Sequence, residues 1–202
     1  MGKLLGKFKS TEEVDFLFVG LGNPGLKYSD TRHNLGAEAI ESFAQSQQYS
    51  FAKVGVARFA RHKTGSGLSV IAIPETFMNE SGKALGNLVS KFKISDPERI
   101  VIVHDELDLP AGTVKLKTGG GMAGHNGLKS VKQHLKTDQF SRLRIGIDRP
   151  QHSGQVSDYV LAKPRPGETA LIQDGQLLAQ QAIDIVIDTG SVEKAMAQVN
   201  AK

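Results

Sequence analysis

The chain has 202 residues, of which 39% are hydrophobic and 23% are charged, and its formal net charge is +4 at pH 7. This length suits a single domain that buries its own core. Because the chain has no cysteine, disulfides, thiolate metal sites and a cysteine nucleophile are excluded, and no apolar run approaches the roughly 20 residues that span a bilayer.

Residues 1–14 mix three lysines with two glutamates and have no long apolar centre. That composition is not typical of a secretory signal peptide. We interpret this segment as an N-terminal extension, followed by one domain over residues 15–202. We expect a cytoplasmic protein that binds no membrane, which the absence of cysteine fits.

The hydrophobic pattern predicts strands that alternate with helices, as in the α/β class. Strands are expected at 15–19, 51–61, 68–73, 99–104, 113–117 and 143–147, with a hairpin turn at 65–67. Helices are expected at 34–47, from 79 or 81 to 92, at 126–135, 168–188 and 192–199, while 155–161 is ambiguous. Asn34 is a candidate cap for the first helix. We therefore expect a mixed β-sheet flanked by α-helices in a single domain.

The positive charge is concentrated in one part of the chain. Residues 110–150 hold eight lysines and arginines against two aspartates, whereas residues 1–109 are neutral and residues 151–202 are slightly acidic. A basic block of this kind indicates either a surface for a phosphate backbone or an ordinary solvated face.

Three polar clusters follow predicted strands, at residues 23–34, 75–79, and 104–105 together with 119–127. Open α/β sheets place their sites at such strand ends. Each cluster contains an asparagine, whose amide can recognise a peptide backbone or a developing oxyanion. Asparagine also favours turns and caps, so both interpretations stay open at this point.

Gly20, Gly22 and Gly25 match the dinucleotide-binding fingerprint. That fingerprint should open directly into a helix, but a polar, turn-like segment follows it here, and Glu41 lies in a helical pattern instead of ending a second strand. The context disfavours a nucleotide-dependent oxidoreductase, which we keep as an alternative.

His33 lies in a polar loop, where a histidine is either simply exposed or a general base. Asp105, at the end of an apolar strand, is a turn cap or the carboxylate that orients such a base. With no cysteine and no Gly-x-Ser-x-Gly elbow, the pair would activate water. The remaining histidines have no metal-ligand spacing, so we expect no metal and no cofactor.

Four ordered blocks resemble bacterial peptidyl-tRNA hydrolase. They are 19–36 with Thr31-Arg32-His33-Asn34, 74–82 with Thr76-Phe77-Met78-Asn79, 104–112 with His104-Asp105-Glu106, and 119–147 with Gly124-His125-Asn126-Gly127. The resemblance spans about residues 16–163. It implies a metal-independent, mainly monomeric enzyme with a twisted mixed sheet, which cleaves the ester between a peptide and the 3′ ribose of tRNA.

The resemblance also implies catalytic roles. His33 would be the general base that activates water, and Asp105 would orient and polarise it. Asn23 and Asn79 would hold the carbonyl and amide groups of the peptide. Asn126 would hold the water or stabilise the oxyanion.

Substrate contacts follow from the same resemblance. Tyr28, Met78 and His125 would line the pocket that takes the substrate, and Lys117 and Arg144 would bind the 5′ phosphate of the tRNA. The chain departs from the family pattern at residues 122–123 and 148, and neither departure removes a catalytic residue. The alternative is a non-catalytic RNA-binding member of the same fold.

Overall fold

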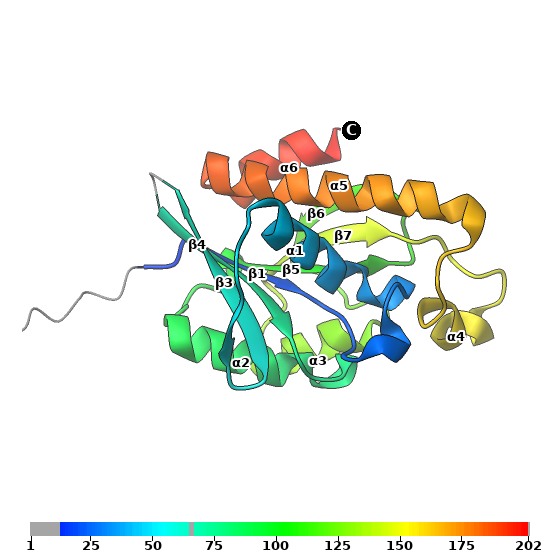
Figure 1. The fold of residues 1–202 in the computed structure, drawn as a ribbon, viewed down its shortest axis with the longest axis horizontal. Helices are drawn as coiled ribbons and strands as arrows, with labels where there is room; N and C mark the ends of the chain where they lie inside the picture. Colours follow the sequence, from blue (N-terminus) through cyan, green and yellow to red (C-terminus); the bar gives the residue numbers. More distant parts are fainter. Residues whose placement is uncertain (1–12, 65–66, 202) are drawn as a thin grey trace, which may run out of the picture.

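The computed structural model describes residues 13–64 and 67–201. Seven strands form one sheet in the order β2-β3-β4-β1-β5-β7-β6. The strands are β1 (Phe16–Gly20), β2 (Ala52–Val54), β3 (Ala57–Thr64), β4 (Gly67–Pro74), β5 (Ile100–Glu106), β6 (Val114–Thr118) and β7 (Ser141–Gly146). Figure 1 shows this sheet between two layers of helices.

The sheet is mixed, as predicted. β1 pairs in parallel with β4 and β5, and β5 pairs in parallel with β7, whereas β2, β3 and β6 are antiparallel to their neighbours. Every residue of β1 and β5 is buried. β1 and residues 100–103 of β5 form continuous apolar runs because helices cover both faces of a central parallel sheet.

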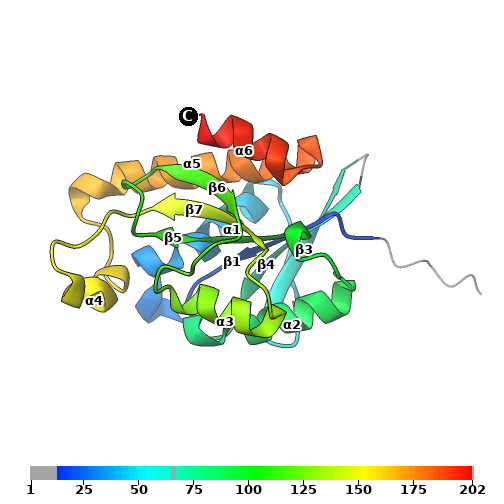
Figure 2. The same cartoon turned by 180° about the vertical axis from the view of Figure 1, so that it is seen from behind.

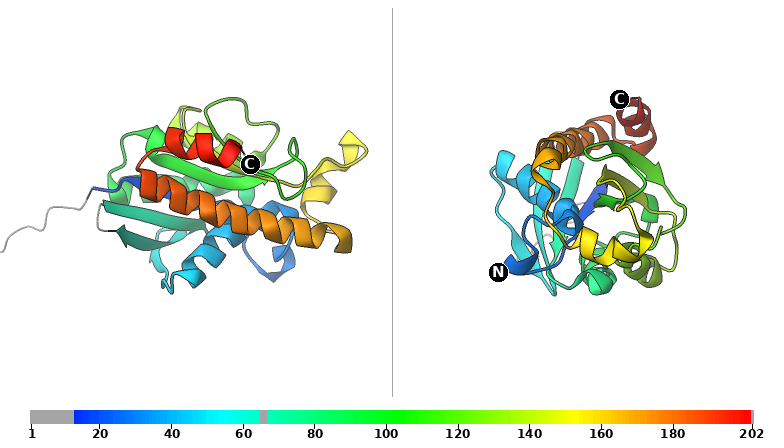
Figure 3. Two further views of the ribbon diagram at one scale, coloured as in Figure 1. Left: turned by 90° about the horizontal axis from the view of Figure 1, so that it is seen from above. Right: turned by 90° about the vertical axis from the view of Figure 1, so that its right-hand side faces the viewer.

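Helices cover the two faces separately. One face carries α1 (Leu35–Ser46), α5 (Pro166–Thr189) and α6 (Val192–Asn200), and the other carries α2 (Ser81–Phe92) and α3 (Asn126–Leu135) (Figure 2). Figure 3 shows α5 and α6 side by side over the sheet. Among the described residues, none of the helices is both long and apolar enough to cross a lipid bilayer.

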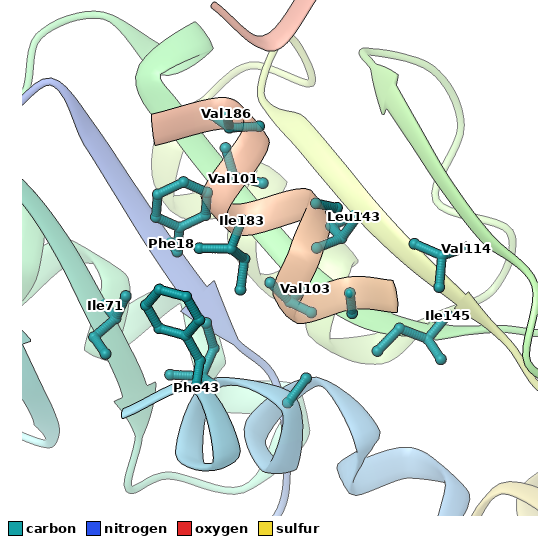
Figure 4. Close-up of a cluster of buried hydrophobic side chains, with 14 of the residues drawn as sticks. Phe18, Phe43, Ile71, Val101, Val103, Val114, Leu143, Ile145, Ile183 and Val186 are labelled. Carbon is teal, nitrogen blue, oxygen red and sulfur yellow. The ribbon is translucent and has the colours of Figure 1, made fainter. Parts of the chain in front are cut away.

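Each face has its own apolar core. In the α1 and α5 layer, Phe18 and Val101 from the sheet lie among Phe43 and Ile183 from the helices (Figure 4). In the α2 and α3 layer, the buried residues include Leu85 and several others: Leu17, Ala84, Leu88, Ile102, Leu128 and Val131. The helical spacing of the apolar side chains on α2 and α3 made these two helices predictable.

Most predicted elements are confirmed with small shifts at their ends. The single strand expected at 51–61 is wrong: the chain forms β2 and β3 there, because Gly55 adopts a φ of 53° and opens a tight turn at residues 55–56. The helix at 126–135 has the predicted bounds, while the strand expected at 143–147 runs over Ser141–Gly146. The ambiguous segment 155–161 forms the short helix α4 (Val156–Val160), which directly follows a 3-10 turn over Ser153–Gln155. Most of the expected 65–67 turn, and residues 1–12 of the expected extension, lie outside the described residues.

The glycine fingerprint serves packing in this fold. A Cβ on Gly20 would lie 2.3 Å from the carbonyl oxygen of Gly36, so β1 and α1 can approach closely only without that atom. A Cβ on Gly22 would lie 2.7 Å from the Cβ of Ala37, and Gly25 has a φ of 95°. Because α1 begins only at Leu35, no helix opens at the glycines to hold a pyrophosphate.

Candidate active site

A cavity of about 460 Å³ opens where β1, β4 and β5 end. The three predicted polar clusters meet there, and the segment around α4 closes the opposite side. All the predicted catalytic and pocket residues line the cavity: Asn23, Tyr28, His33, Met78, Asn79, Asp105, His125 and Asn126. Residues that had no predicted role also line it, among them Phe77, His104, Glu106, Leu107, Met122, Val160 and Leu161. Lys117 and Arg144 lie outside this lining.

His33 and Asp105 form a buried pair. The turn Arg32–Asn34 presents His33, and β5 presents Asp105, which are 8% and 3% exposed. The Nδ1 atom of His33 lies 2.9 and 3.1 Å from the two carboxylate oxygens of Asp105. Nε2 of His33 has no hydrogen-bond partner among the residues that the structure describes, so its ring edge is available at the cavity.

The Asp105 carboxylate is held ionised by its neighbours. Burial alone raises the pKa of Asp105, but the rings of His125 and His33 outweigh burial, and its pKa lies well below the usual range. An ionised carboxylate only accepts hydrogen bonds. Nδ1 of His33 therefore carries the proton, which leaves the lone pair of Nε2 to act as a base.

His125 is the second donor to Asp105. Its Nε2 lies 3.0 Å from Oδ1 of Asp105, and its Nδ1 accepts from the backbone N–H groups of Gly127 and Leu128 at 3.1 and 3.4 Å. Because a backbone N–H can only donate, the ring proton sits on Nε2. Both nitrogens of His125 are thus used within the protein, and the ring offers the cavity a surface but no free polar atom.

The cluster of His33, Asp105 and His125 also has a spacing that could hold a metal ion, since its ligand atoms lie within 4.8 Å of one another. A metal ligand must present a lone pair. The nitrogens that face Asp105 instead carry protons and bond it directly at 2.9 to 3.1 Å. The donor set fits a hydrogen-bonded catalytic cluster better than a coordination sphere.

His104 is a buried neutral histidine beside this cluster. Its Nδ1 donates to the backbone carbonyl of Asp105 at 2.7 Å, and its ring packs edge-on against His125 with 5.1 Å between centroids. Burial, followed by the nearby His125, lowers the pKa of His104 to about 3. The sequence offered no signal for this role, because His104 sits at the end of an otherwise apolar strand.

The depressed pKa of His104 predicts that acid weakens the fold. An unfolded histidine has a pKa near 6.5, so on acidification the unfolded chain takes up this proton before the folded one does. The contribution to stability is complete above about pH 6.5 and falls by about 1.4 kcal/mol per pH unit below it. Urea unfolding at pH 7 and pH 5 should show this loss in wild type and a smaller loss in His104→Asn, which keeps a donor and cannot titrate. Equal losses would contradict the assignment.

The three predicted asparagines all present amide groups to the cavity. The Oδ1 atom of Asn23 accepts the backbone N–H of Met78 at 2.8 Å, so its Nδ2 donors are left for the cavity. Asn79 and Asn126 are exposed, and their side chains make no hydrogen bond within the described part of the chain. The site thus combines one base with several uncharged donors.

Apolar side chains form the mouth of the cavity. Tyr28 and Phe77 pack edge to face with 6.3 Å between ring centroids, and Phe77 is 52% exposed. Met78 is buried beneath them. Phe77 was part of a predicted cluster without a role of its own, and exposed aromatic rings at a cavity rim suit contacts with flat substrate groups.

The basic residues lie on β6 and β7, outside the cavity lining. Lys117 stands opposite Arg142 in the sheet register, whereas Arg144 stands opposite Lys115. Arg144 is paired with Glu106, its Nε lying 2.9 Å from the carboxylate. Arg142 is buried, with 3% of its surface exposed. It donates to the carbonyl of Gly121 at 2.7 Å, and its two other side-chain nitrogens have no hydrogen-bond partner in the described structure.

The glycine-rich loop at residues 119–124 lies against the side chains of Arg142 and Lys117. A Cβ on Gly120 would lie 3.0 Å from a terminal nitrogen of Arg142 and 3.1 Å from the Nζ atom of Lys117. Lys117 and Arg144 are the residues predicted from the sequence to bind phosphate, whereas Arg142 had no predicted role. The register between β6 and β7, which the sequence does not show, places Lys117 opposite Arg142.

The two departures from the family pattern share a backbone feature. Ala123 and Asp148 have φ angles of 46° and 59°. This left-handed region disfavours alanine more than aspartate, whose short polar side chain tolerates it. The strain at Ala123 therefore falls in the loop that lines the cavity.

Known proteins that resemble this chain in sequence and in fold include members of one family. Residues 17–202 match the family model described as peptidyl-tRNA hydrolase. The peptidyl-tRNA hydrolases of Nitrosomonas eutropha and Haemophilus influenzae are each 44% identical to this chain, over 92% of it and 95% and 96% of their own lengths. A crystal structure of a peptidyl-tRNA hydrolase with N-propanol superposes with a TM-score of 0.86 at 35% identity, covering 95% of this chain and 98% of that one. The chain belongs to the peptidyl-tRNA hydrolase family.

Proposed function

We propose that this protein hydrolyses the ester bond between a peptide, or an N-blocked aminoacyl group, and the 3′ ribose of tRNA. The observation that carries the proposal is the buried pair of His33 and Asp105, whose free ring nitrogen faces a cavity rich in amide donors. Membership of the peptidyl-tRNA hydrolase family supports it. The retained base and carboxylate disfavour a non-catalytic RNA-binding role.

The reaction needs one activated water. Nε2 of His33 removes a proton from water as the water oxygen attacks the ester carbonyl, and Asp105 stabilises the imidazolium that forms. The tetrahedral intermediate then collapses, the bond to the ribose oxygen breaks, and His33 returns the proton to that oxygen. The products are free tRNA and a peptide with a terminal carboxylic acid, which releases its proton to solvent and becomes a carboxylate.

The asparagines supply the remaining chemistry. The Nδ2 group of Asn23 donates to the carbonyl oxygen as negative charge develops on it. Asn79 holds peptide amide groups, and Asn126 holds the water or supports the oxyanion. Uncharged amides that contact only the peptide backbone tolerate any side chain, which suits a substrate class that includes many peptides.

We also propose that the enzyme works without a metal ion or an organic cofactor, as a monomer in the cytoplasm. The Asp105 carboxylate already accepts hydrogen bonds from His33 and His125, and this arrangement supports metal independence. Tyr28, Met78 and Phe77 line the path of the ester and the terminal adenosine.

The basic strands bind the tRNA body through its phosphates. Lys117 and Arg144 are the proposed contacts, and Arg142 adds positive charge beside Lys117. We expect Lys117→Ala and Arg144→Ala each to raise KM with little change in kcat, and to reduce the slope of log affinity against log salt by about 1. Lys53→Ala is the matched control, because β2 forms the opposite edge of the sheet from β6. A slope equal to that of wild type in both variants would count against phosphate binding here.

Incubation with N-acetylaminoacyl-tRNA tests the function itself. Release of the N-acetylamino acid at a rate that scales with enzyme concentration is the expected result, and added chelator should not change it. Tight tRNA binding without release would favour the RNA-binding alternative. Tight binding of a nicotinamide dinucleotide in calorimetry, also without release, would favour the oxidoreductase.

A further inference from the structure

Asn34, the residue after His33, has a buried side chain that does not cap α1. It occupies the cap position, 8% exposed, but the predicted cap bond is not formed. Instead, its Oδ1 accepts the backbone N–H of Asn23 at 2.8 Å, and its Nδ2 donates to the backbone carbonyl of Asn23 at 2.9 Å. One side chain thus bonds both backbone groups of a residue 11 positions away. We call this pair of hydrogen bonds from Asn34 to the backbone of Asn23 the clasp.

The first turn of α1 does not need Asn34 as a cap. The backbone N–H of Ala37 donates to the carbonyl of Leu21 at 2.9 Å, so the loop after β1 satisfies a free amide at the helix start. Gly22 packs on the other side of the clasp, where a Cβ would lie 3.3 Å from Cγ and Oδ1 of Asn34. The Asn34 amide is therefore held between the loop and the helix.

The clasp fixes a residue that faces the cavity. The backbone of Asn23 is held by Asn34, and its side-chain oxygen is held by the N–H of Met78. The free Nδ2 of Asn23 is then aimed by three hydrogen bonds. The next four residues of the loop, 24–27, are exposed, so little else holds this part of the loop.

We propose that Asn34 is a positioning residue that sets the Asn23 donor relative to the His33 base. His33 and Asn34 share one short turn, Arg32–Asn34, so a single rigid element carries the base and the clasp. The proposal rests on the proposed function. An oxyanion donor acts only within about 2.7–3.1 Å of the developing charge, and a misplacement of about 1 Å can lower the rate about 100-fold.

A double-mutant cycle tests whether Asn34 acts through Asn23. We expect Asn34→Ala to lower kcat about 10- to 100-fold with little change in KM, and Asn23→Ala to lower it at least as much. The double variant should have the kcat of Asn23→Ala, because the clasp has no function without its target. Asn34→Asp, which keeps only the acceptor for the Asn23 N–H, should fall between wild type and Asn34→Ala. Losses that multiply in the double variant would overturn the proposal.

The chain provides a matched control. Asn200 clasps Leu116 in the same way, its Oδ1 accepting the backbone N–H at 2.8 Å and its Nδ2 donating to the carbonyl at 2.9 Å. Neither residue lines the catalytic cavity. We expect Asn200→Ala to lower the melting temperature as Asn34→Ala does while leaving kcat unchanged. Unchanged kcat in a folded Asn34→Ala variant would overturn the proposal.

A structural readout separates this proposal from the proposed function. In a crystal structure of Asn34→Ala, the side-chain amide of Asn23 should be displaced or disordered while the pair of His33 and Asp105 is unchanged. An Asn23 amide in its wild-type position would overturn the positioning role whether or not the enzyme is active. Absence of ester hydrolysis by wild type would instead overturn the proposed function.

Discussion

Replacement of His33 by alanine is expected to lower kcat for N-acetylaminoacyl-tRNA about 100- to 10,000-fold, the usual contribution of a general base. The variant loses the nitrogen that accepts a proton from water, while Asp105 keeps its hydrogen bond from His125. The affinity for tRNA should change little, since the basic strands lie outside the cavity. Single-turnover kinetics with enzyme in excess measures the chemical step.

His134→Ala is the matched control for that experiment. His134 lies near the end of α3, where its ring bonds the backbone carbonyl of Ser130 at 3.0 Å and lines no part of the cavity. Its loss should leave the rate unchanged. Turnover by His33→Ala within a few-fold of wild type would refute the general-base role, and a loss that arose only from weaker tRNA binding would refute it equally.

Replacement of Arg32 by alanine is expected to have the largest effect on stability, lowering the free energy of unfolding by about 3–5 kcal/mol. Arg32 is 1% exposed. One guanidinium nitrogen donates to the carbonyls of Tyr159, Ala162 and Lys163 at 3.0 to 3.2 Å, and another bonds the carboxylate of Glu168. Truncation removes all four of these side-chain hydrogen bonds and loosens the segment around α4, which closes the cavity.

Urea unfolding measures this loss, and two further variants interpret it. Arg32→Lys keeps the charge but not the planar fork of donors, so it should recover only part of the stability. Arg149→Ala removes an exposed pair with Asp108, and it should cost less than about 1 kcal/mol. An Arg32→Ala variant as stable as Arg149→Ala would show that the buried network contributes little.

The pairing of His33 with Asp105 was predictable because it depends on local pattern. Apolar strands that end in polar loops predicted where His33 and Asp105 lie, and parallel strands bring such ends to one edge of a sheet. The four ordered blocks then added the roles of the asparagines. The long helices were predictable for a similar reason, since their apolar residues repeat with the helical period.

The contacts that organise the site depend on distant parts of the chain. In the sequence, Arg32 is only a polar residue of a polar loop. The groups that accept hydrogen bonds from its guanidinium lie 127 to 136 residues away. The sequence does not show that both nitrogens of His125 are occupied, or that Lys117 faces Arg142, because register and tautomer follow from packing. The short helix α4 has five residues, too few to show a helical period.

The dependence of kcat/KM on pH for N-acetylaminoacyl-tRNA hydrolysis tests the central claim most directly. The rate is expected to rise with pH, because a general base accepts a proton from water only when its own nitrogen is unprotonated. This rise should disappear in His33→Ala, while Asn34→Ala keeps it at a lower rate. A wild-type rate that does not depend on pH, or a rise that persists in His33→Ala, would contradict the account.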